Sequence, residues 1–408
     1  MPETSSISID HFPSFLARLP PDLDLEALGR QTKAFQRARG VRSVKDLLRL
    51  ALAWAVGGHS QQSVAAWAHE YGIASLSEEA LHKHLHTCVD FLKALTGKLL
   101  EHASGAPCWH GRSLRIADST SLSIPGSKGT DFRVHGVYDL GAGGFTHLEV
   151  TDSRGGEALD RGKPVAGEIR IADRGYANAQ AWQRFLAERP GETDFIVRMR
   201  WNTIRLVDGT GKPFDLIDWL ARVDPEKQVR EIPVLAQSGK RQTPIPIRLI
   251  AWRKTPEQAE AARKQLYQRA SRKQSKIDPR SLVAAEYIAI ATSLDAETFP
   301  AEEVLAAYRL RWQIELAFKR LKSLLNIDDI RTRTDTGTRC WLYAHLIVAL
   351  LHDDLSQDIL ASFPSGPFRG GSHQFPVAHR QNRARRDPPG DRAGNDAGHA
   401  QTRAQVPA

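Results

Sequence analysis

Apolar residues recur at spacings of three and four along roughly the first hundred positions of the chain. The runs VKDLLRLALAWAV and EALHKHLHTCVDFLKALTGKLL show this spacing most clearly. Such spacing places apolar side chains on one face of an α-helix, so residues 1–105 are predicted to form a helical N-terminal domain.

Two helical segments within this domain are separated by Gly72, and Ser77 is placed to cap the second segment. The second segment carries three side chains able to contact DNA: His82, Lys83 and His84. This unit is a candidate helix-turn-helix motif, which makes residues 1–105 a candidate DNA-binding domain. A plain helical hairpin is the open alternative, because the turn is long for the standard motif.

From about residue 110 the pattern changes to short runs that are typical of β-strands. They are RIADSTSLSI, then FRVHGVYDL and GFTHLEVTD joined by the hairpin-like GAGG, then EIRIADRG. A helix is predicted next, over ANAQAWQRFLAERPG. Two of the strand runs contain Ile-Ala-Asp, so each delivers a carboxylate, Asp118 or Asp173, at the end of a buried strand. Open α/β sheets place their sites at such ends, although a turn cap is the alternative for either Asp alone.

The segment YRLRWQIELAFKRLK, residues 308–322, combines a phenol, a guanidinium, a carboxylate and an ammonium group. At about 100° per residue, a continuous helix places these four groups within roughly 60° of one another. The four residues are Tyr308, Arg311, Glu315 and Lys322. An adjacent apolar arc would dock the helix on a core: Leu310, Ile314, Ala317, Phe318 and Leu321. This face indicates chemistry on a phosphate backbone, although Arg and Glu four positions apart are also an ordinary surface pair.

Glu315 lies 142 positions after Asp173, which is far more than one strand connection needs. Residues 191–285 are therefore predicted to be an insertion. Short strand-like runs are followed there by a basic stretch, and residues 253–280 hold nine Lys or Arg against three acids. The run EYIAIATSL then returns the chain to the main sheet, EEVLAAYRLRW begins the helix of the third acid, and WLYAHLIVALLHDDL is predicted to cover the sheet.

These residues resemble three motifs of the DDE transposases of bacterial insertion sequences, specifically insertion-sequence family four. The third motif of that family is Tyr-x2-Arg-x3-Glu-x6-Lys, and residues 308–322 match it without a gap. The second motif is similar to the run DRGY that begins at Asp173, and the first is similar to the run DST that begins at Asp118. The resemblance extends from about residue 110 to about residue 360.

The resemblance implies an α/β fold, in which a β-rich insertion interrupts a ribonuclease H-like catalytic core with a mixed sheet. The predicted parts are the helical domain 1–105, the core 106–190 and 286–363, the insertion with its basic helix 191–285, and a disordered tail 364–408. Residues 366–408 contain no Leu, Ile, Lys, Glu, Trp or Tyr, so they cannot bury enough apolar surface to fold. The tail resembles a wrong-frame translation; a basic DNA-binding tail is the alternative.

The resemblance also implies that Asp118, Asp173 and Glu315 are catalytic and hold two Mg²⁺ ions, for which Mn²⁺ can substitute. Asp118 bridges both ions, and the carboxylates are the hard oxygen ligands that Mg²⁺ prefers. The implied DNA-binding residues are Tyr308, Arg311, Lys322 and Arg174. Trp201 and Trp252 are candidates for stacking on an unpaired base, since hairpin-forming relatives extrude one; a core position is the alternative.

Composition agrees with a large enzyme that binds a polyanion. The 408 residues carry 56 Lys or Arg against 47 acids, a net charge of +9. The few, widely spaced cysteines indicate reduced thiols: Cys88, Cys108 and Cys340. Neither a signal peptide nor a membrane span is predicted, so the chain is expected in the bacterial cytoplasm, associated with the nucleoid.

Three functions are consistent with these features. The predicted one is a transposase that cleaves DNA and transfers strands at the terminal inverted repeats of an insertion sequence. Its partners would be transposon ends and target DNA, and it would be a homodimer when two ends are synapsed. A catalytically inactive or decayed DNA-binding relative is the second. A nuclease or phosphohydrolase with the same two-metal site is the third, which the basic insertion and the additional N-terminal domain disfavour.

Overall fold

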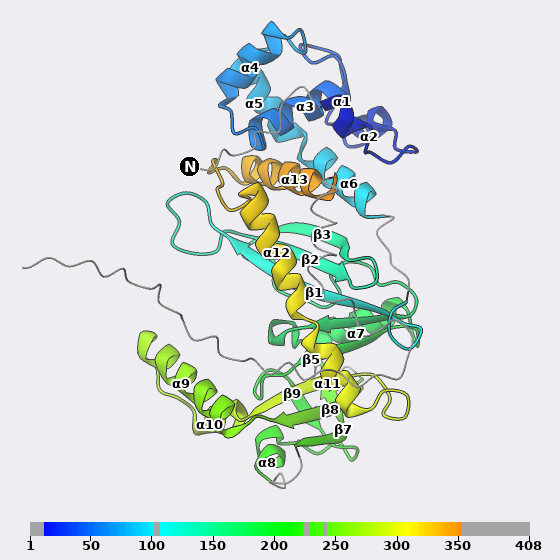
Figure 1. Ribbon diagram of the computed structural model, residues 1–408, viewed down its shortest axis with the longest axis vertical. Coiled ribbons are helices and arrows are strands. Elements are labelled where there is room, and N and C mark those ends of the chain that lie inside the picture. The colour runs from blue at the N-terminus through cyan, green and yellow to red at the C-terminus, as the bar shows by residue number, and fades with distance from the viewer. Residues whose placement is uncertain (1–11, 102–106, 223–227, 240–242, 352–408) are drawn as a thin grey trace, which may run out of the picture. The chain divides into compact units, whose positions relative to one another are not determined.

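The computed structural model describes residues 12–101, 107–222, 228–239 and 243–351 (Figure 1). The predicted tail, residues 364–408, lies outside the described residues. Within this part of the chain, no helix is long and apolar enough to cross a membrane. The fold is mixed α/β, with a large mixed sheet and a helical N-terminal region, which confirms the predicted class at this level.

The N-terminal region is helical, as its apolar spacing predicted. Its helices are α1 (Phe12–Leu16), α2 (Leu25–Gln31), α3 (Val44–Ala55), α4 (Gln61–Glu70), α5 (Glu78–Thr87) and α6 (Val89–Leu100). Gly72 follows α4 in a left-handed conformation with φ of +65°, which favours glycine. Ser77 caps α5, as predicted, because its side chain accepts a hydrogen bond from the Ala80 N–H.

Within the described ranges, nine strands form one mixed sheet. They are β1 (Ser113–Leu122), β2 (Phe132–Asp139), β3 (Gly144–Asp152), β4 (Glu168–Ala172), β5 (Asp194–Arg198), β6 (Arg205–Val207), β7 (Val229–Gln237), β8 (Ile245–Arg253) and β9 (Tyr287–Thr292). Their spatial order is β3-β2-β1-β4-β5-β9-β8-β7-β6. β4 pairs in parallel with both β1 and β5, whereas the other neighbouring pairs are antiparallel. The predicted hairpin of β2 and β3 is therefore present.

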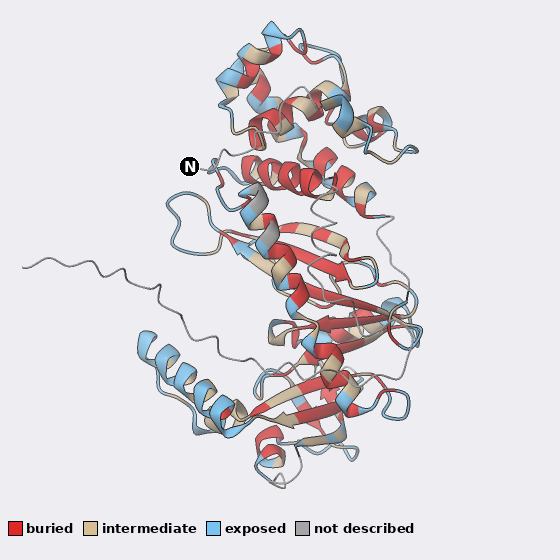
Figure 2. Ribbon diagram, viewed as in Figure 1, coloured by how far each residue is buried: buried red, intermediate tan, exposed pale blue. Residues whose placement is uncertain are grey.

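Strands from the predicted insertion extend this same sheet. β9 pairs with β5 on one side and with β8 on the other, so β8, β7 and β6 continue outward from the central strands. Three helices accompany them: α8 (Leu216–Ala221), α9 (Pro256–Arg272) and α10 (Pro279–Ala285). The predicted basic stretch forms α9, which begins with a capping box between Thr255 and Gln258. Among the residues of α9 only Ala259 is buried, and most of its charged side chains are exposed (Figure 2), although Arg263 pairs with Glu286.

The two faces of the sheet are covered by different helices. Leu114 and Ile116 of β1 pack on the face that carries α12 (Trp312–Leu325) and α13 (Asp335–Leu351), whereas Ala117 packs on the side of α7 (Ala179–Glu188). α13 is buried along most of its length and also contacts α3, α5 and α6 (Figure 2). It therefore packs the N-terminal helices and the sheet into one core.

The prediction of one continuous helix through residues 308–322 is wrong. α11 (Ala301–Arg309) ends before Leu310, and α12 begins at Trp312. Between them the Arg311 N–H donates to the Tyr308 carbonyl at 3.1 Å, and the Gln313 N–H donates to the Leu310 carbonyl at 3.0 Å. These are tight i to i−3 bonds of the 3₁₀ type. The tight turn separates two helices that dock differently, because α11 contacts β5 and β7 while α12 contacts β1 and α13.

The predicted apolar arc does dock α12 on the core. Its buried members are Ile314, Ala317, Phe318 and Leu321, and Leu310 is partly buried against the same cluster. Gly136 of β2 makes room for this contact, since a Cβ atom there would lie 2.9 Å from the Phe318 ring. Because Gly136 is also the β2 partner of Asp118, this close approach brings α12 to the strand that carries the first acid.

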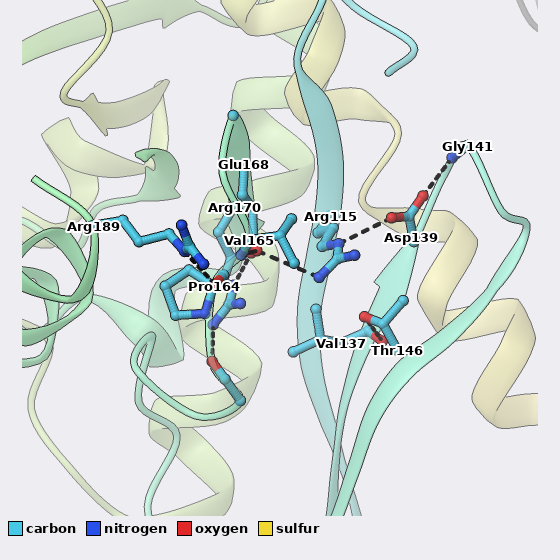
Figure 3. A network of polar contacts seen from close by, with 12 residues as sticks. Arg115, Val137, Asp139, Gly141, Thr146, Pro164, Val165, Glu168, Arg170 and Arg189 are labelled. Atoms are coloured by element: carbon cyan, nitrogen blue, oxygen red, sulfur yellow. Dashed lines mark hydrogen bonds and ion pairs between the residues drawn. The ribbon is translucent and has the colours of Figure 1, made fainter. Parts of the chain in front are cut away.

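A buried ionic network fixes the central strands from the α7 side (Figure 3). The Arg170 guanidinium on β4 is fully buried and donates to Glu168 at 2.6 Å and to the carbonyls of Leu159, Arg161 and Gly162. Arg115 on β1 pairs with Asp139 at 2.9 Å and with Glu168 at 3.5 Å. The network joins β1, β2, β4 and the loop before β4. Its members were not predicted from the sequence.

Candidate active site

The pairing of β1 with β4 sets Asp118 beside Asp173. The last parallel pair is Ala117 with Ala172, so each acid stands one residue beyond it on strands about 4.8 Å apart. Side chains alternate along a strand, so Asp118 follows Leu114 and Ile116 on the face covered by α12. Asp118 does not end its strand as predicted, because β1 continues to Leu122 with β2 as its partner.

The turn between α11 and α12 brings the third motif to both acids. The Tyr308 hydroxyl donates to Asp173 Oδ1 at 3.2 Å. One Arg311 nitrogen lies 2.7 Å from Glu315 Oε1, and another lies 3.8 Å from Asp118 Oδ2. Arg311 thus stands between two of the three predicted catalytic acids, and Tyr308 contacts the remaining one.

The two aspartates are held in different electrostatic states. Burial raises the pKa of Asp118 to about 6, and the charges of Glu157 and Glu315 add to this rise against the opposing Arg311 charge. Burial alone would raise the pKa of Asp173 too, but the Arg174 N–H and the Arg311 charge outweigh it and lower that pKa.

The pKa of the Tyr308 phenol is shifted by the same surroundings. Burial and the negative charge of Asp173 raise the pKa of Tyr308 to about 12, so it stays a neutral donor at physiological pH. A neutral hydroxyl can orient the Asp173 carboxylate through a hydrogen bond without neutralising its negative charge.

Lys322 contacts the strand that carries Asp118, and Arg174 is the residue next to Asp173. Lys322 Nζ donates to the Ser121 carbonyl at 3.3 Å, three positions along β1 from Asp118. Arg174 directly follows Asp173 and lines a cavity of about 460 Å³. The cavity is basic, with cationic lining residues Arg174, Arg198, Arg200, Lys254 and Arg269. Burial lowers the pKa of Arg174, and the neighbouring arginine charges lower it further. Clustered cations of this kind favour a polyanionic ligand.

The two tryptophans proposed for base stacking are half-buried. Trp201 lines the basic cavity, its indole N–H donates to Ser281 at 3.1 Å, and the Arg280 guanidinium lies 4.8 Å from its ring. Trp252 packs partly against the core, with the Arg309 guanidinium 5.9 Å from its ring. Base stacking on either ring stays a prediction.

Two residues of the site were missed in the sequence. Glu157, in the loop before β4, accepts a hydrogen bond from the Ser119 hydroxyl at 2.9 Å and lies 3.5 Å from Arg133. Arg198 of β5 lies 4.0 Å from Asp173. Neither belongs to a recognisable motif, and no local sequence signal marks them.

The chemistry of the donor set fits a divalent cation. Three carboxylates supply hard oxygen atoms, and besides the burial that mainly raises the pKa of Asp118, the charges of Glu157 and Glu315 lie close enough to raise it further. In the described ranges no three His, Cys, Asp or Glu side chains are grouped closely enough to hold one ion. Arg311 instead contacts Asp118 and Glu315 in this arrangement.

Comparison with known proteins identifies the family. Residues 109–351, more than half of the chain, match the family model described as Transposase DDE domain. The chain belongs to the DDE transposases. It is therefore an enzyme that acts on DNA, and members of this family generally use divalent metal ions.

Named relatives agree with this assignment. The transposase for insertion sequence element IS421 of Escherichia coli is 38% identical over 371 residues, covering 90% of this chain and 99% of the relative. The transposase for insertion sequence element IS231F of Bacillus thuringiensis subsp. israelensis is 27% identical over 368 residues, covering 80% of this chain and 76% of that relative. The similarity thus includes the N-terminal helices as well as the DDE domain.

Proposed function

We propose that this transposase belongs to insertion-sequence family four and acts at the terminal inverted repeats of its own element. It would cleave DNA there and transfer the strands into target DNA. The observation that carries the proposal is the turn between α11 and α12, which brings Tyr308 to Asp173 and Arg311 to both Asp118 and Glu315. The names of the relatives, which are transposases for insertion sequence elements, support it.

Asp118, Asp173 and Glu315 are the proposed catalytic residues and ligands of two Mg²⁺ ions, with Mn²⁺ as a substitute. Ions held by these residues would supply activation of the attacking oxygen and stabilisation of the leaving oxygen of a phosphodiester. The family resemblance implies that Asp118 would be the ligand shared by both ions; it lies beside Asp173 in the sheet and near Arg311, the partner of Glu315. Tyr308 orients Asp173 through its hydrogen bond.

Arg311, Lys322, Tyr308 and Arg174 are the proposed contacts to DNA phosphates. Arg311 is well placed for this role, because cations bound by the acids would compete with its guanidinium and turn it toward the substrate. Arg174 lines the basic cavity, whose other cationic side chains supply further positive charge near Asp173. The exposed basic helix α9 supplies a second, more general contact to the DNA backbone.

The central strands support a ribonuclease H-like core. The sheet order β3-β2-β1-β4-β5, with a three-stranded antiparallel part followed by parallel strands, is the order such a core requires. Because β5 (Asp194–Arg198) pairs with β4, we place this strand in the core rather than in the insertion 191–285 predicted from the sequence. The other proposed boundaries are those predicted from the sequence, with α4 and α5 as the candidate helix-turn-helix. Synapsis of two DNA ends by a homodimer is part of the same proposal.

Cleavage of the element's own DNA tests this function. The full chain is incubated with labelled duplexes copied from both sides of its coding sequence, with and without Mg²⁺. We expect binding, Mg²⁺-dependent nicks at one fixed position, and joined products; Asp173→Asn should bind the duplexes without nicking them. Binding without nicks by the unaltered chain would favour the decayed DNA-binding alternative. Binding no stronger than that of a random duplex would refute the proposal.

A further inference from the structure

A fourth carboxylate, that of Glu157, contacts β1 next to Asp118 and the turn that follows Asp173. Glu157 belongs to the loop between β3 and β4, and its side chain is about one quarter exposed, at 27%. Oε1 accepts the Ser119 hydroxyl at 2.9 Å, and the Ser119 backbone N–H donates to Asp118 Oδ1 at 2.8 Å. Glu157 is therefore connected to Asp118 through one residue.

The other carboxylate oxygen of Glu157 reaches the turn after β4. A Cβ atom added to Gly175 would lie 1.6 Å from Glu157 Oε2, so no side chain fits there while Glu157 keeps its place. The backbone of Gly175 is not left-handed, hence its conformation does not require glycine. Glycine is therefore required in the Asp-Arg-Gly-Tyr run because the Glu157 side chain occupies the position that a Cβ atom would take.

The loop that carries Glu157 is itself anchored. Arg170, buried on β4, donates to the carbonyls of Leu159, Arg161 and Gly162, which follow Glu157 closely in the same loop. Arg161 in turn donates to the Gly156 carbonyl, immediately before Glu157. A carboxylate on so restrained a loop is held in place before any ligand binds.

We propose that Glu157 is a positioning residue of the active site, which fixes Asp118 and increases the affinity of the acids for divalent cations. It acts in two ways. Its hydrogen bond holds Ser119 and thereby the β1 backbone at Asp118, and its negative charge strengthens the field that attracts a cation. Arg133, 3.5 Å from Oε1, offsets only part of that charge at a partly exposed position. The inference rests on the proposed roles of Asp118, Asp173 and Glu315.

Calorimetric titration of the full, metal-free chain with Mn²⁺ tests the inference without requiring catalysis. Partners that orient metal ligands typically change metal affinity by about 10–100-fold when removed, and we expect a loss of about 10-fold for Glu157→Ala. Glu157→Gln should lose less, because its amide oxygen still accepts from Ser119. The matched control is Glu188→Gln, which removes one charge at an exposed position on α7 and should bind Mn²⁺ like the unaltered chain.

Gly175→Ala provides an independent perturbation. The added methyl group must displace Glu157, so this variant should show the same loss of Mn²⁺ affinity as Glu157→Ala. Combined with Glu157→Ala, it should add nothing, because its effect acts through the missing side chain. Additive losses in the double variant would overturn the proposal.

The same titration of Asp118→Asn separates this inference from the proposed function. Loss of Mn²⁺ binding in Asp118→Asn, together with unchanged affinity in Glu157→Ala, would refute only the role of Glu157. Unchanged affinity in both would refute the metal site itself. At saturating Mg²⁺, cleavage by Glu157→Ala should recover to within a few fold of the unaltered rate, and a rate that stays low at every Mg²⁺ concentration would contradict a positioning role.

Discussion

Arg311 and divalent cations should compete for the same carboxylates. In the metal-free chain the Arg311 guanidinium lies 2.7 Å from Glu315 and 3.8 Å from Asp118. At an effective dielectric constant of about 20, a pair near 4 Å has a gross Coulomb energy of roughly 4 kcal/mol. Measured surface pairs contribute only about 0.2–1 kcal/mol each, so the two contacts together stabilise the metal-free state by about 0.4–2 kcal/mol.

Replacing Arg311 with Met should remove this competition. At tenfold per 1.4 kcal/mol, Arg311→Met should bind Mn²⁺ about 2- to 30-fold more tightly than the unaltered chain in the absence of DNA. Calorimetric titration at pH 8 and low salt measures the effect. Arg309→Met, which removes an exposed charge from the end of α11, is the control and should change the affinity less than about twofold. Equal or weaker Mn²⁺ binding by Arg311→Met would refute the reasoning.

Three further changes probe the DNA contacts, the electrostatics and the buried network. Lys322→Ala should weaken binding to the transposon ends without altering sequence preference, and should reduce the slope of log affinity against log salt concentration by about 1. Lys319→Ala, on the exposed side of α12, should leave that slope unchanged. Equal slopes for Lys322→Ala and the unaltered chain in gel-shift titrations would exclude a phosphate contact by Lys322. Because the pKa of Asp118 is raised to about 6 in the fold, its ionisation destabilises the metal-free chain as pH rises from about 4 to 6. Asp118→Asn should therefore have a free energy of unfolding about 1–3 kcal/mol higher than that of the unaltered chain at pH 8, and an equal one at pH 4. A difference in stability that grows toward low pH would contradict this sign. Arg170→Met removes the closer ionic partner of buried Glu168 and leaves only the 3.5 Å contact with Arg115, so it should lower stability by about 3–5 kcal/mol in thermal melts. The exposed Arg184→Met should cost less than about 1 kcal/mol, and similar melting of both variants would show that the network adds no stability.

Local patterns were sufficient to predict most secondary structure and the candidate acids. These predictions depend on patterns within fewer than ten residues: the helical spacing before residue 105, the β2–β3 hairpin and the strands that contain Ile-Ala-Asp. The parallel register of β1 and β4 then follows from two similar runs, since both present their apolar side chains to the same face. Asp118 and Asp173 are predictable because they continue these runs.

Features that depend on tertiary contacts could not be predicted in the same way. No Pro or Gly marks the break at Leu310, and the tight turn separates two helices that pack against different strands. Glu157 contacts a serine 38 positions earlier from a loop without periodicity. Arg170 and Glu168 alternate like exposed residues of a strand, whereas the loop carbonyls and the Phe185 ring of α7 cover Arg170 in the fold.

Cysteine substitution of the acids tests the central claim most directly. A thiolate is a poor ligand for Mg²⁺ but accepts softer ions such as Mn²⁺ or Cd²⁺, so the metal preference of cleavage reports direct contact between a residue and an ion. Asp118→Cys, Asp173→Cys and Glu315→Cys are assayed for nicking of duplexes from the flanks of the coding sequence. We predict that each variant fails to nick in Mg²⁺ and regains nicking when the softer ions are added. Nicking in Mg²⁺ at the unaltered rate by any one of the three would contradict the assignment of that residue as a metal-binding catalytic acid.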